Sequence, residues 1–282
     1  MSSILTNNSA IVALQTLKGI NSNLSKTQAE ISTGKSVANA KDNAAIWAIS
    51  KVMETDQSAF KNIQSQLNVA DATVATARSG AEMVTKLLTE MKDLAVGAIN
   101  STADFGKINT DIENKISQIA SIVSGTQMNG VNLLSAGGTM EVVGSLDREN
   151  GNPETAQNTI TVASVDLETA LDLDLEAGTS GSYTGITDVD TAKAMVTAIE
   201  NMIDAAVGGA ADLGSAGKRI SDQATFVGQL ADSLKVGIGA LVDADMEEAS
   251  ARLQALQTQQ QLGIQSLSIA NQAPQSILSL FR

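Results

Sequence analysis

The 282-residue chain contains no cysteine and no histidine. Without cysteine it can form neither a disulfide nor a thiolate metal site, and it has no thiol nucleophile. Without histidine it lacks the commonest metal ligand and the usual general base at neutral pH, which excludes a Ser-His-Asp triad and an HExxH zinc site. The sequence therefore predicts no catalytic residue, no cofactor and no metal, and we expect a protein that is not an enzyme.

Aromatic residues are also scarce: they make up 2% of the chain, although 43% of it is hydrophobic. Alanine, valine, isoleucine, leucine and methionine must therefore supply the core. Small aliphatic side chains allow long helices to approach closely, whereas aromatic rings would hold the helices apart. This composition favours a helical protein over a compact α/β enzyme.

Basic residues are outnumbered, with 18 Lys and Arg against 31 Asp and Glu and a net charge of -13. An acidic chain repels phosphate backbones and anionic membrane surfaces, so we expect no nucleic-acid partner. No stretch approaches the ~20 apolar residues of a membrane span, so we expect no membrane insertion. The first basic residue is Lys18 and no compact apolar run follows a charged start, so a cleaved signal peptide is not expected either.

Two long segments carry heptad patterns, in which apolar residues recur at alternating spacings of three and four. The first pattern begins with Ile46 and Ile49 and predicts one helix over 44–99, roughly 84 Å long. The second ends at Leu241 and has a matching length. Two such patterns are most simply paired with each other as antiparallel helices. The residues that we expect in the core of this pair are Phe60, Ile63, Leu67, Val74, Leu88, Ile199, Leu213, Val227 and Leu234.

The region between these two helices does not continue the heptad pattern. A third helix is predicted over 107–124, with Asp104 as its start signal. Residues 135–188 contain Pro153 and several helix breakers, together with short β-type runs at 140–143 and 159–162. We expect a small hairpin-rich insert that is exposed at the tip. The Gly208-Gly209 pair is expected to weaken the second long helix.

The sequence predicts weaker amphipathic helices at the two ends of the chain. Polar residues such as Asn21 and Gln260 occupy heptad positions there that are apolar in a stable coiled coil. The frame shifts by five residues between Leu241 and Met246, which predicts an interruption of the helix there. Such arms would stay disordered until many copies pack together and burial repays the ordering entropy. Frayed ends on a monomer remain the alternative.

Short sequence motifs in both halves of the chain resemble those of bacterial flagellins. Thr-Asn-Asn-Ser-Ala (6–10), Ser-Thr-Gly-Lys (32–35) and Ala-Lys-Asp-Asn-Ala-Ala (40–45) are similar to the N-terminal signature of that family. Asp-Ala-Asp-Met-Glu-Glu (243–248), Ala-Asn-Gln-Ala-Pro-Gln (270–275) and Leu-Ser-Leu-Phe-Arg (278–282) are similar to its C-terminal signature, and Ser-Gly-Thr-Gln-Met-Asn-Gly (124–130) to the turn after its third helix. Asn43, Ile46 and Trp47 match the variant of alphaproteobacterial flagellins, in which we expect Trp47 to serve packing.

The resemblance implies a mainly α fold, in which long antiparallel heptad-patterned helices form a hairpin-shaped coiled coil or bundle with a small β-hairpin-rich insert. It implies the structural subunit of the flagellar filament, a homopolymer outside the cell that drives motility. The expected domains are the N-terminal arm of an inner polymerisation domain (1–43), the two halves of a long-helix core domain (44–134 and 189–242), the short exposed insert (135–188) and the C-terminal arm (243–282).

The resemblance also implies partners and assembly residues. An export chaperone, a cap protein and the hook–filament junction protein are the implied partners, with type III export and no cleaved signal peptide. The polymerisation residues expected in the arms are Leu14, Leu17, Leu24, Ile31, Leu253, Leu256, Leu267, Ala270, Asn271, Leu278, Leu280, Phe281 and Arg282.

The stretch around Glu90 and Leu94 corresponds to the surface that the vertebrate innate flagellin receptor recognises in this family. Immune-stimulating enteric flagellins carry an arginine at the position of Glu90, so the reversed charge predicts weak receptor activation.

Two other interpretations of the sequence remain open. One is the hook–filament junction protein, which shares the terminal arms. Another is a coiled-coil signalling or secretion-chaperone module, which would form a small closed oligomer. A protease in the insert is known among flagellins, but it needs histidines that this chain lacks.

Overall fold

The computed structural model describes residues 7–100, 103–146, 158–174, 178–181 and 183–280, without the side chains of 174 and 273–280. The chain divides into two compact units, residues 1–57 with 232–282, and residues 58–231. The division falls within helices α2 (Ala44–Gly97) and α5 (Val189–Val242), each of which contributes residues to both units. No helix of the described residues is both long and apolar enough to cross a membrane.

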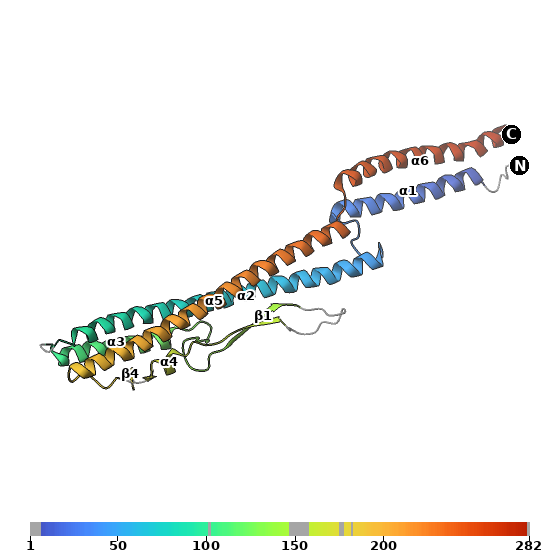
Figure 1. Ribbon diagram of the computed structural model, residues 1–282. Coiled ribbons are helices and arrows are strands. Elements are labelled where there is room, and N and C mark those ends of the chain that lie inside the picture. The colour runs from blue at the N-terminus through green and yellow to red at the C-terminus, as the bar shows by residue number, and fades with distance from the viewer. Residues whose placement is uncertain (1–6, 101–102, 147–157, 175–177, 182, 281–282) are drawn as a thin grey trace. The chain divides into compact units, whose positions relative to one another are not determined.

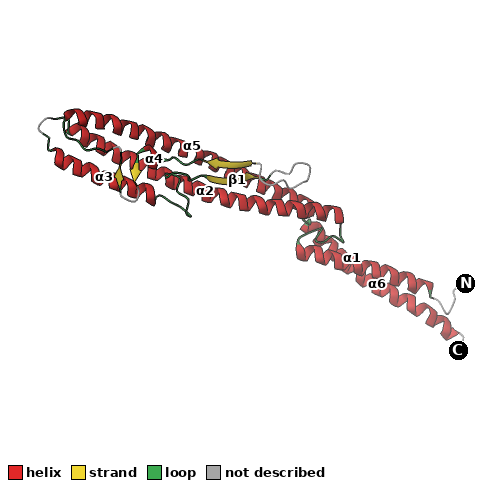
Figure 2. Ribbon diagram, turned by 90° about the horizontal axis from the view of Figure 1, so that it is seen from below, coloured by secondary structure: helices red, strands yellow, loops and turns green. Residues whose placement is uncertain are grey.

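In the unit of residues 58–231, α2 and α5 lie side by side with α3 (Phe105–Gly125), as Figures 1 and 2 show. The two long helices are antiparallel: Gln64 bonds the Ala224 carbonyl at one point, and Lys92 pairs with Glu200 further along. The heptad residues of this unit expected in the core are all buried: Phe60, Ile63, Leu67, Val74, Leu88, Ile199, Leu213 and Val227. The predicted mainly α fold with paired long helices and a small hairpin is confirmed.

At one end of each long helix, the residue at the predicted heptad position is exposed and its neighbour is buried. Ile49 is 55% exposed while its neighbour Ser50 is buried, and Leu241 is 37% exposed while Val242 is buried. Leu234, the remaining expected core residue, is only partly buried. At the end of α5, a straight helix drifts by about 20° per heptad against a strict seven-residue repeat, so the buried stripe passes from Leu241 to the following residue. This drift has the opposite sign near the start of α2 and does not explain the burial of Ser50.

The described residues between α3 and α5 form two small antiparallel sheets and one short helix. Strands β1 (Met140–Ser145) and β2 (Asn158–Val162) pair with Met140 opposite Val162, at the positions where strands were predicted. Strands β3 (Leu173–Asp174) and β4 (Thr179–Ser180) form the second sheet, and α4 (Leu167–Ala170) lies between β2 and β3. Pro153, which contributed to the prediction of the insert, lies outside the described residues.

The expectation that this insert is simply exposed is wrong for its apolar residues. Leu167, Leu171 and Ile186 are fully buried, so the segment supplies part of the core of its unit. Two glycines permit the close approach. A Cβ at Gly209 would lie 2.0 Å from Val165 Cγ1, and a Cβ at Gly80 would lie 2.8 Å from Leu134 Cδ1. The missing side chains therefore let the segment pack directly against α5 and α2.

In the other unit, the terminal helices α1 (Asn8–Thr33) and α6 (Met246–Leu280) run side by side (Figure 1). The interruption predicted from the five-residue shift is confirmed, because α5 ends at Val242 and α6 begins at Met246.

Candidate functional site: the terminal helices

Local signals fix both ends of the terminal helices. The Asn7 side chain accepts a hydrogen bond from the Ala10 N–H over 3.1 Å and so caps the start of α1. Gly34 ends α1 with a φ of 69°, a left-handed conformation that favours glycine. The Asp245 carboxylate accepts from the Glu247 and Glu248 N–H groups over 3.0 and 3.1 Å and caps α6. These signals can be read from the sequence because they act over only a few residues.

The segments that join α1 to α2 and α5 to α6 bond to each other. The Ser36 N–H donates to the Val242 carbonyl over 2.7 Å, and the Ala244 N–H donates to the Gly34 carbonyl over 2.9 Å. Lys35 and Asp243 form an antiparallel bridge between these bonds. We refer to residues 34–36 and 242–244 as the clasp. The motifs at 32–35 and 243–248, which resemble the family signature and come from opposite halves of the chain, thus contact each other in the clasp.

An ion cluster lies beside the clasp. The Glu54 carboxylate lies 2.6 Å from the Lys51 ammonium and 3.3 Å from that of Lys35. The hydrogen bond from Lys51 is the largest cause and lowers the pKa of Glu54 below its usual value. Desolvation opposes this shift, and the hydrogen bond from Lys35 adds to the lowering. Sequence analysis missed Lys35, Ser36 and Glu54 as site residues. The stop signal at Gly34 and the start signal at Asp245 could have pointed to this meeting of helix ends.

Polar contacts join α1 to α6 along their length. The Asn7 Nδ2 donates to the Ala270 carbonyl over 2.7 Å, and the Gln260 Nε2 donates to the Asn21 Oδ1 over 2.7 Å. Rising numbers on α1 face falling numbers on α6, so the helices are antiparallel. Asn21 and Gln260, which sequence analysis treated only as weakening the heptad frames, are partners.

The described side chains of α1 and α6 bury little. Among them, Thr27, Ala249 and Leu256 are the buried ones. The expected polymerisation residues that are partly buried between the helices are Leu17, Leu24, Ile31, Leu253, Leu267 and Ala270. Leu14 is 44% exposed, and Asn271 is also exposed. Leu278 and Leu280 belong to α6 but their side chains are not described, and Phe281 and Arg282 lie outside the described residues.

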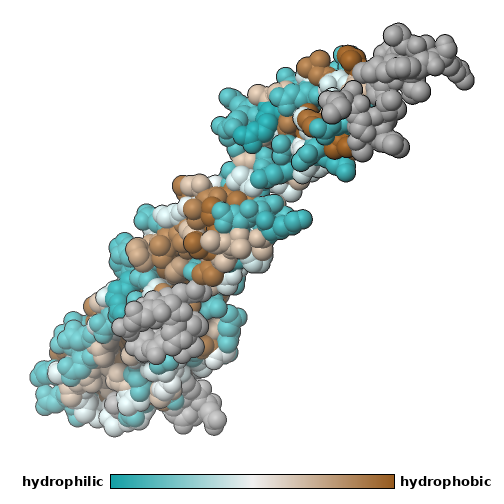
Figure 3. Space-filling model, turned by 90° about the vertical axis from the view of Figure 1, so that its right-hand side faces the viewer, coloured by the Kyte–Doolittle hydropathy of each residue, from teal (hydrophilic) through white to brown (hydrophobic). Residues whose placement is uncertain are grey.

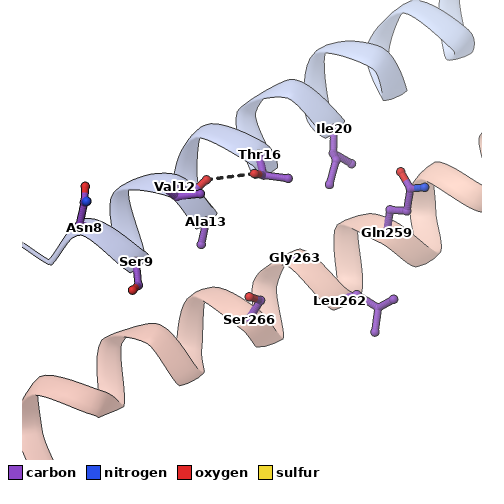
Figure 4. A pocket seen from close by; sticks show the side chains of 10 residues that line it. All are labelled: Asn8, Ser9, Val12, Ala13, Thr16, Ile20, Gln259, Leu262, Gly263 and Ser266. Carbon is purple, nitrogen blue, oxygen red and sulfur yellow. Dashed lines mark hydrogen bonds between the residues drawn. The ribbon is translucent and has the colours of Figure 1, made fainter.

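A groove of about 720 Å³ runs between the two helices near the chain ends (Figure 4). Small side chains line much of it, among them Ser9, Ala13 and Ser266, together with Gly263. Large apolar side chains of the same two helices are exposed: Ile11, Val12, Leu262, Ile264 and Ile269. Figure 3 shows hydrophobic side chains, in brown, uncovered among hydrophilic ones. Such a surface is suited to packing against further helices.

Family models match both halves of the chain. The model described as the bacterial flagellin N-terminal helical region matches residues 4–139, and that of the C-terminal helical region matches residues 196–281. The chain belongs to the bacterial flagellin family. It is a structural subunit of the flagellar filament, a homopolymer outside the cell, as the sequence predicted.

Similar flagellins match this one over its whole length. A flagellin of Brucella melitensis is 40% identical over 100% of both chains, and flagellin FljK of Caulobacter vibrioides is 37% identical over 100% of this chain and 99% of its own. The predicted resemblance to alphaproteobacterial flagellins is confirmed. The crystal structure of Bacillus cereus flagellin covers 67% of this chain and 94% of its own, with 19% identity and a TM-score of 0.40.

The stretch around Glu90 and Leu94, for which the sequence predicted a receptor-like surface, carries two ion pairs. Glu90 on α2 pairs with Lys115 on α3, and Lys92 pairs with Glu200 on α5 at 2.8 Å. The hydrogen bond that Lys115 donates to Glu90 lowers the pKa of Glu90, and the hydrogen bond that Lys92 donates to Glu200 raises the pKa of Lys92. Leu94 is partly buried. The negative charge of Glu90 is therefore held next to a positive one.

Proposed function

We propose that this flagellin assembles into its filament through α1 and α6, the helices of the arms 1–43 and 243–282. The observation that carries the proposal is the exposure of large apolar side chains on these two helices. Two of them, Val12 and Leu262, line the groove together with small residues. Val12 is 58% exposed, Leu262 59% and Ile269 69%.

Exposed aliphatic surface of this kind favours burial by about 25 cal/mol per Å² of area removed from water. The other candidate for covering it would be another part of the same chain, but α1 and α6 already face each other. Neighbouring copies are the natural cover, because a flagellin filament places many identical chains in contact. A heterologous interface that does not close into a ring yields an open helical polymer.

Truncation tests the proposal at coarse scale. Chains lacking residues 1–35 or 250–282 should form no filaments after seeding or salting, while the helices of the unit 58–231 keep their circular dichroism. If either shortened chain still builds long uniform filaments, the arms are not the assembly surface.

Point variants test it more sharply. Ile264→Asp places a carboxylate on a side chain that is 54% exposed in the single chain. If neighbouring copies bury this position, the carboxylate costs several kcal/mol and assembly should fail, whereas the helix content of the subunit should not change. Gln265→Asp adds the same charge at the next, exposed residue and is the matched control. Leu267→Asp should also prevent assembly, although Leu267 is partly buried against α1 already.

The remaining expectations belong with this proposal. Residues 44–134 and 189–242 would form the long-helix core domain, and 135–188 the insert. The subunit would be exported by the flagellar type III apparatus without cleavage of a signal peptide, held by an export chaperone, assembled beneath a cap protein, and attached to the hook–filament junction protein. It would act without catalytic chemistry and would activate the innate flagellin receptor weakly, because Glu90 stands where enteric flagellins have arginine.

A further inference from the structure

A proline lies inside helix α6. Pro274 falls within Met246–Leu280, and the only other proline of the chain is Pro153. Proline has no backbone N–H, so it cannot donate to the carbonyl four residues earlier in a helix. That carbonyl belongs to Ala270. In the interior of α6, the Ala270 carbonyl therefore receives no hydrogen bond from the residue four positions later, because Pro274 has no N–H.

Asn7 provides a donor at this position. Its Nδ2 lies 2.7 Å from the Ala270 carbonyl oxygen, and its Oδ1 accepts from the Ala10 N–H over 3.1 Å. The amide is thus used at both ends, as a cap for α1 and as a replacement for the bond that Pro274 removes from α6. Aspartate could keep the cap but could not donate.

We propose that Asn7 and Pro274 together set the register in which α1 pairs with α6, and so decide how the arms present their apolar faces to other copies. The inference rests on the proposed role of the arms in assembly. It assigns a specificity-determining function to the side-chain amide of Asn7 and to the backbone N–H that Pro274 lacks.

The arms need such a device because their aliphatic contacts repeat. A slip of one heptad moves α1 by about 10 Å along α6 and brings similar apolar residues together again. A slip toward the start of α6 would instead set Asn7 against carbonyls that already have helical donors. In either direction it would set Asn21, now bonded to Gln260, opposite Leu253 or Leu267. Polar pairs therefore discriminate between registers that apolar contacts tolerate.

A double-mutant cycle tests the pairing, with the critical concentration for filament assembly as the measured quantity. Asn7→Asp should raise this concentration about tenfold, the equivalent of about 1.4 kcal/mol for a lost hydrogen bond and an unsatisfied carbonyl. Asn8→Asp is the matched control: it adds the same charge to the first turn of α1, and Figure 4 shows the Asn8 side chain directed away from α6. Its effect should stay below about twofold.

Pro274→Ala returns an N–H to α6, and the Ala270 carbonyl then has a helical donor. In that background, the effect of Asn7→Asp should fall to that of Asn8→Asp. An undiminished effect of Asn7→Asp in the Pro274→Ala chain, or equal effects of the two aspartate variants in the parent chain, would overturn the inference.

The absence of cysteine allows a direct measurement of register in assembled filaments. The pair Leu17→Cys and Gly263→Cys should form a disulfide within one chain, because the Leu17 side chain lies 3.2 Å from the place of a Cβ at Gly263. The pair Leu17→Cys and Leu256→Cys, one heptad away, should not. Adding Asn7→Asp should increase cross-linking of the second pair, and unchanged cross-linking of both pairs would contradict a role in register.

The two proposals fail differently. If truncated chains still polymerise, the arms are not the assembly surface. If truncation abolishes filaments but the cycle shows no coupling between positions 7 and 274, only the register inference is wrong.

Discussion

At the residue scale, one asparagine organises the segment that leads into α5. The Asn109 Oδ1 accepts from the Tyr183 hydroxyl over 2.6 Å and from the Ile186 N–H over 2.8 Å, while its Nδ2 donates to the Ile186 carbonyl over 3.0 Å. Buried polar groups need partners, and a single side chain of α3 here satisfies three of them. No pattern in the sequence indicated Asn109, because its partners lie more than seventy residues away.

Tyr183 makes this arrangement measurable, because it is the only tyrosine of the chain. Burial, and after it the negative charge of Glu113, raises the pKa of Tyr183 to about 12. Since the neutral phenol is favoured in the folded chain, the stability linked to it should be present below pH ~10 and be lost as the pH rises toward 12. Ultraviolet absorbance of the phenolate measures the titration. Ionisation near pH 10 in the folded subunit would contradict the burial.

The glycine pair of α5 offers a second test at this scale, with its control built in. Sequence analysis expected both residues to weaken the helix. The structure gives them different surroundings: nothing lies within 4 Å of a Cβ at Gly208, whereas a Cβ at Gly209 would meet Val165 at 2.0 Å. Gly208→Ala should therefore stabilise the fold by about 0.5–1 kcal/mol, and Gly209→Ala should destabilise it by about 1–3 kcal/mol. Urea unfolding measures both values, and equal effects would show that Val165 can move away.

At the scale of elements, the clasp between residues 34–36 and 242–244 joins the ends of four helices. The motifs that form the clasp and the interruption between Leu241 and Met246 were recognised in the sequence, but their pairing was not predicted. Their pairing is a long-range backbone contact, with Ser36 and Val242 separated by 206 positions.

The ion cluster beside the clasp predicts a dependence on pH. Because Lys51 and Lys35 lower the pKa of Glu54, the Glu54 carboxylate should stabilise the folded clasp above the ordinary glutamate pKa. This stabilisation should be lost as the pH falls through the lowered pKa. Hydrogen exchange of the Ser36 and Ala244 amides measures the strength of the clasp. The parent chain should protect them more than a Glu54→Gln variant near neutrality, and the difference should vanish in acid. A difference that persists at low pH would mean that charge is not its cause.

At the scale of the whole molecule, composition and function agree. A chain with 2% aromatic residues can pack its helices closely, but its terminal helices leave many of their large apolar side chains exposed in the single chain. Stability of these helices is therefore expected to come from neighbouring copies, which links their order to assembly. An enzyme would need a rigid site in the single chain, whereas a filament subunit does not.

The expectation of weak recognition by the innate flagellin receptor concerns the assembled surface of the whole subunit and can be tested at this scale. Glu90→Arg alone would break the pair with Lys115, so the informative variant is Glu90→Arg with Lys115→Glu, which keeps the pair with its charges exchanged. We expect the parent subunit to be weak in a reporter-cell assay and the exchanged variant to be stronger. Full potency of the parent chain would show that the charge at position 90 does not decide recognition.

The sequence by itself determined the helices, their caps, the break before Met246, the two predicted strands and the family. All of these depend on residues a few positions apart, where hydrogen bonding and helical periodicity act locally. Only the tertiary structure decided that the insert is part of a core, that Ser50 rather than Ile49 is buried, and that Asn7 meets Ala270. Those outcomes depend on which surfaces pack together across up to 263 positions, and heptad patterns of small aliphatic residues are too similar to one another to specify that choice.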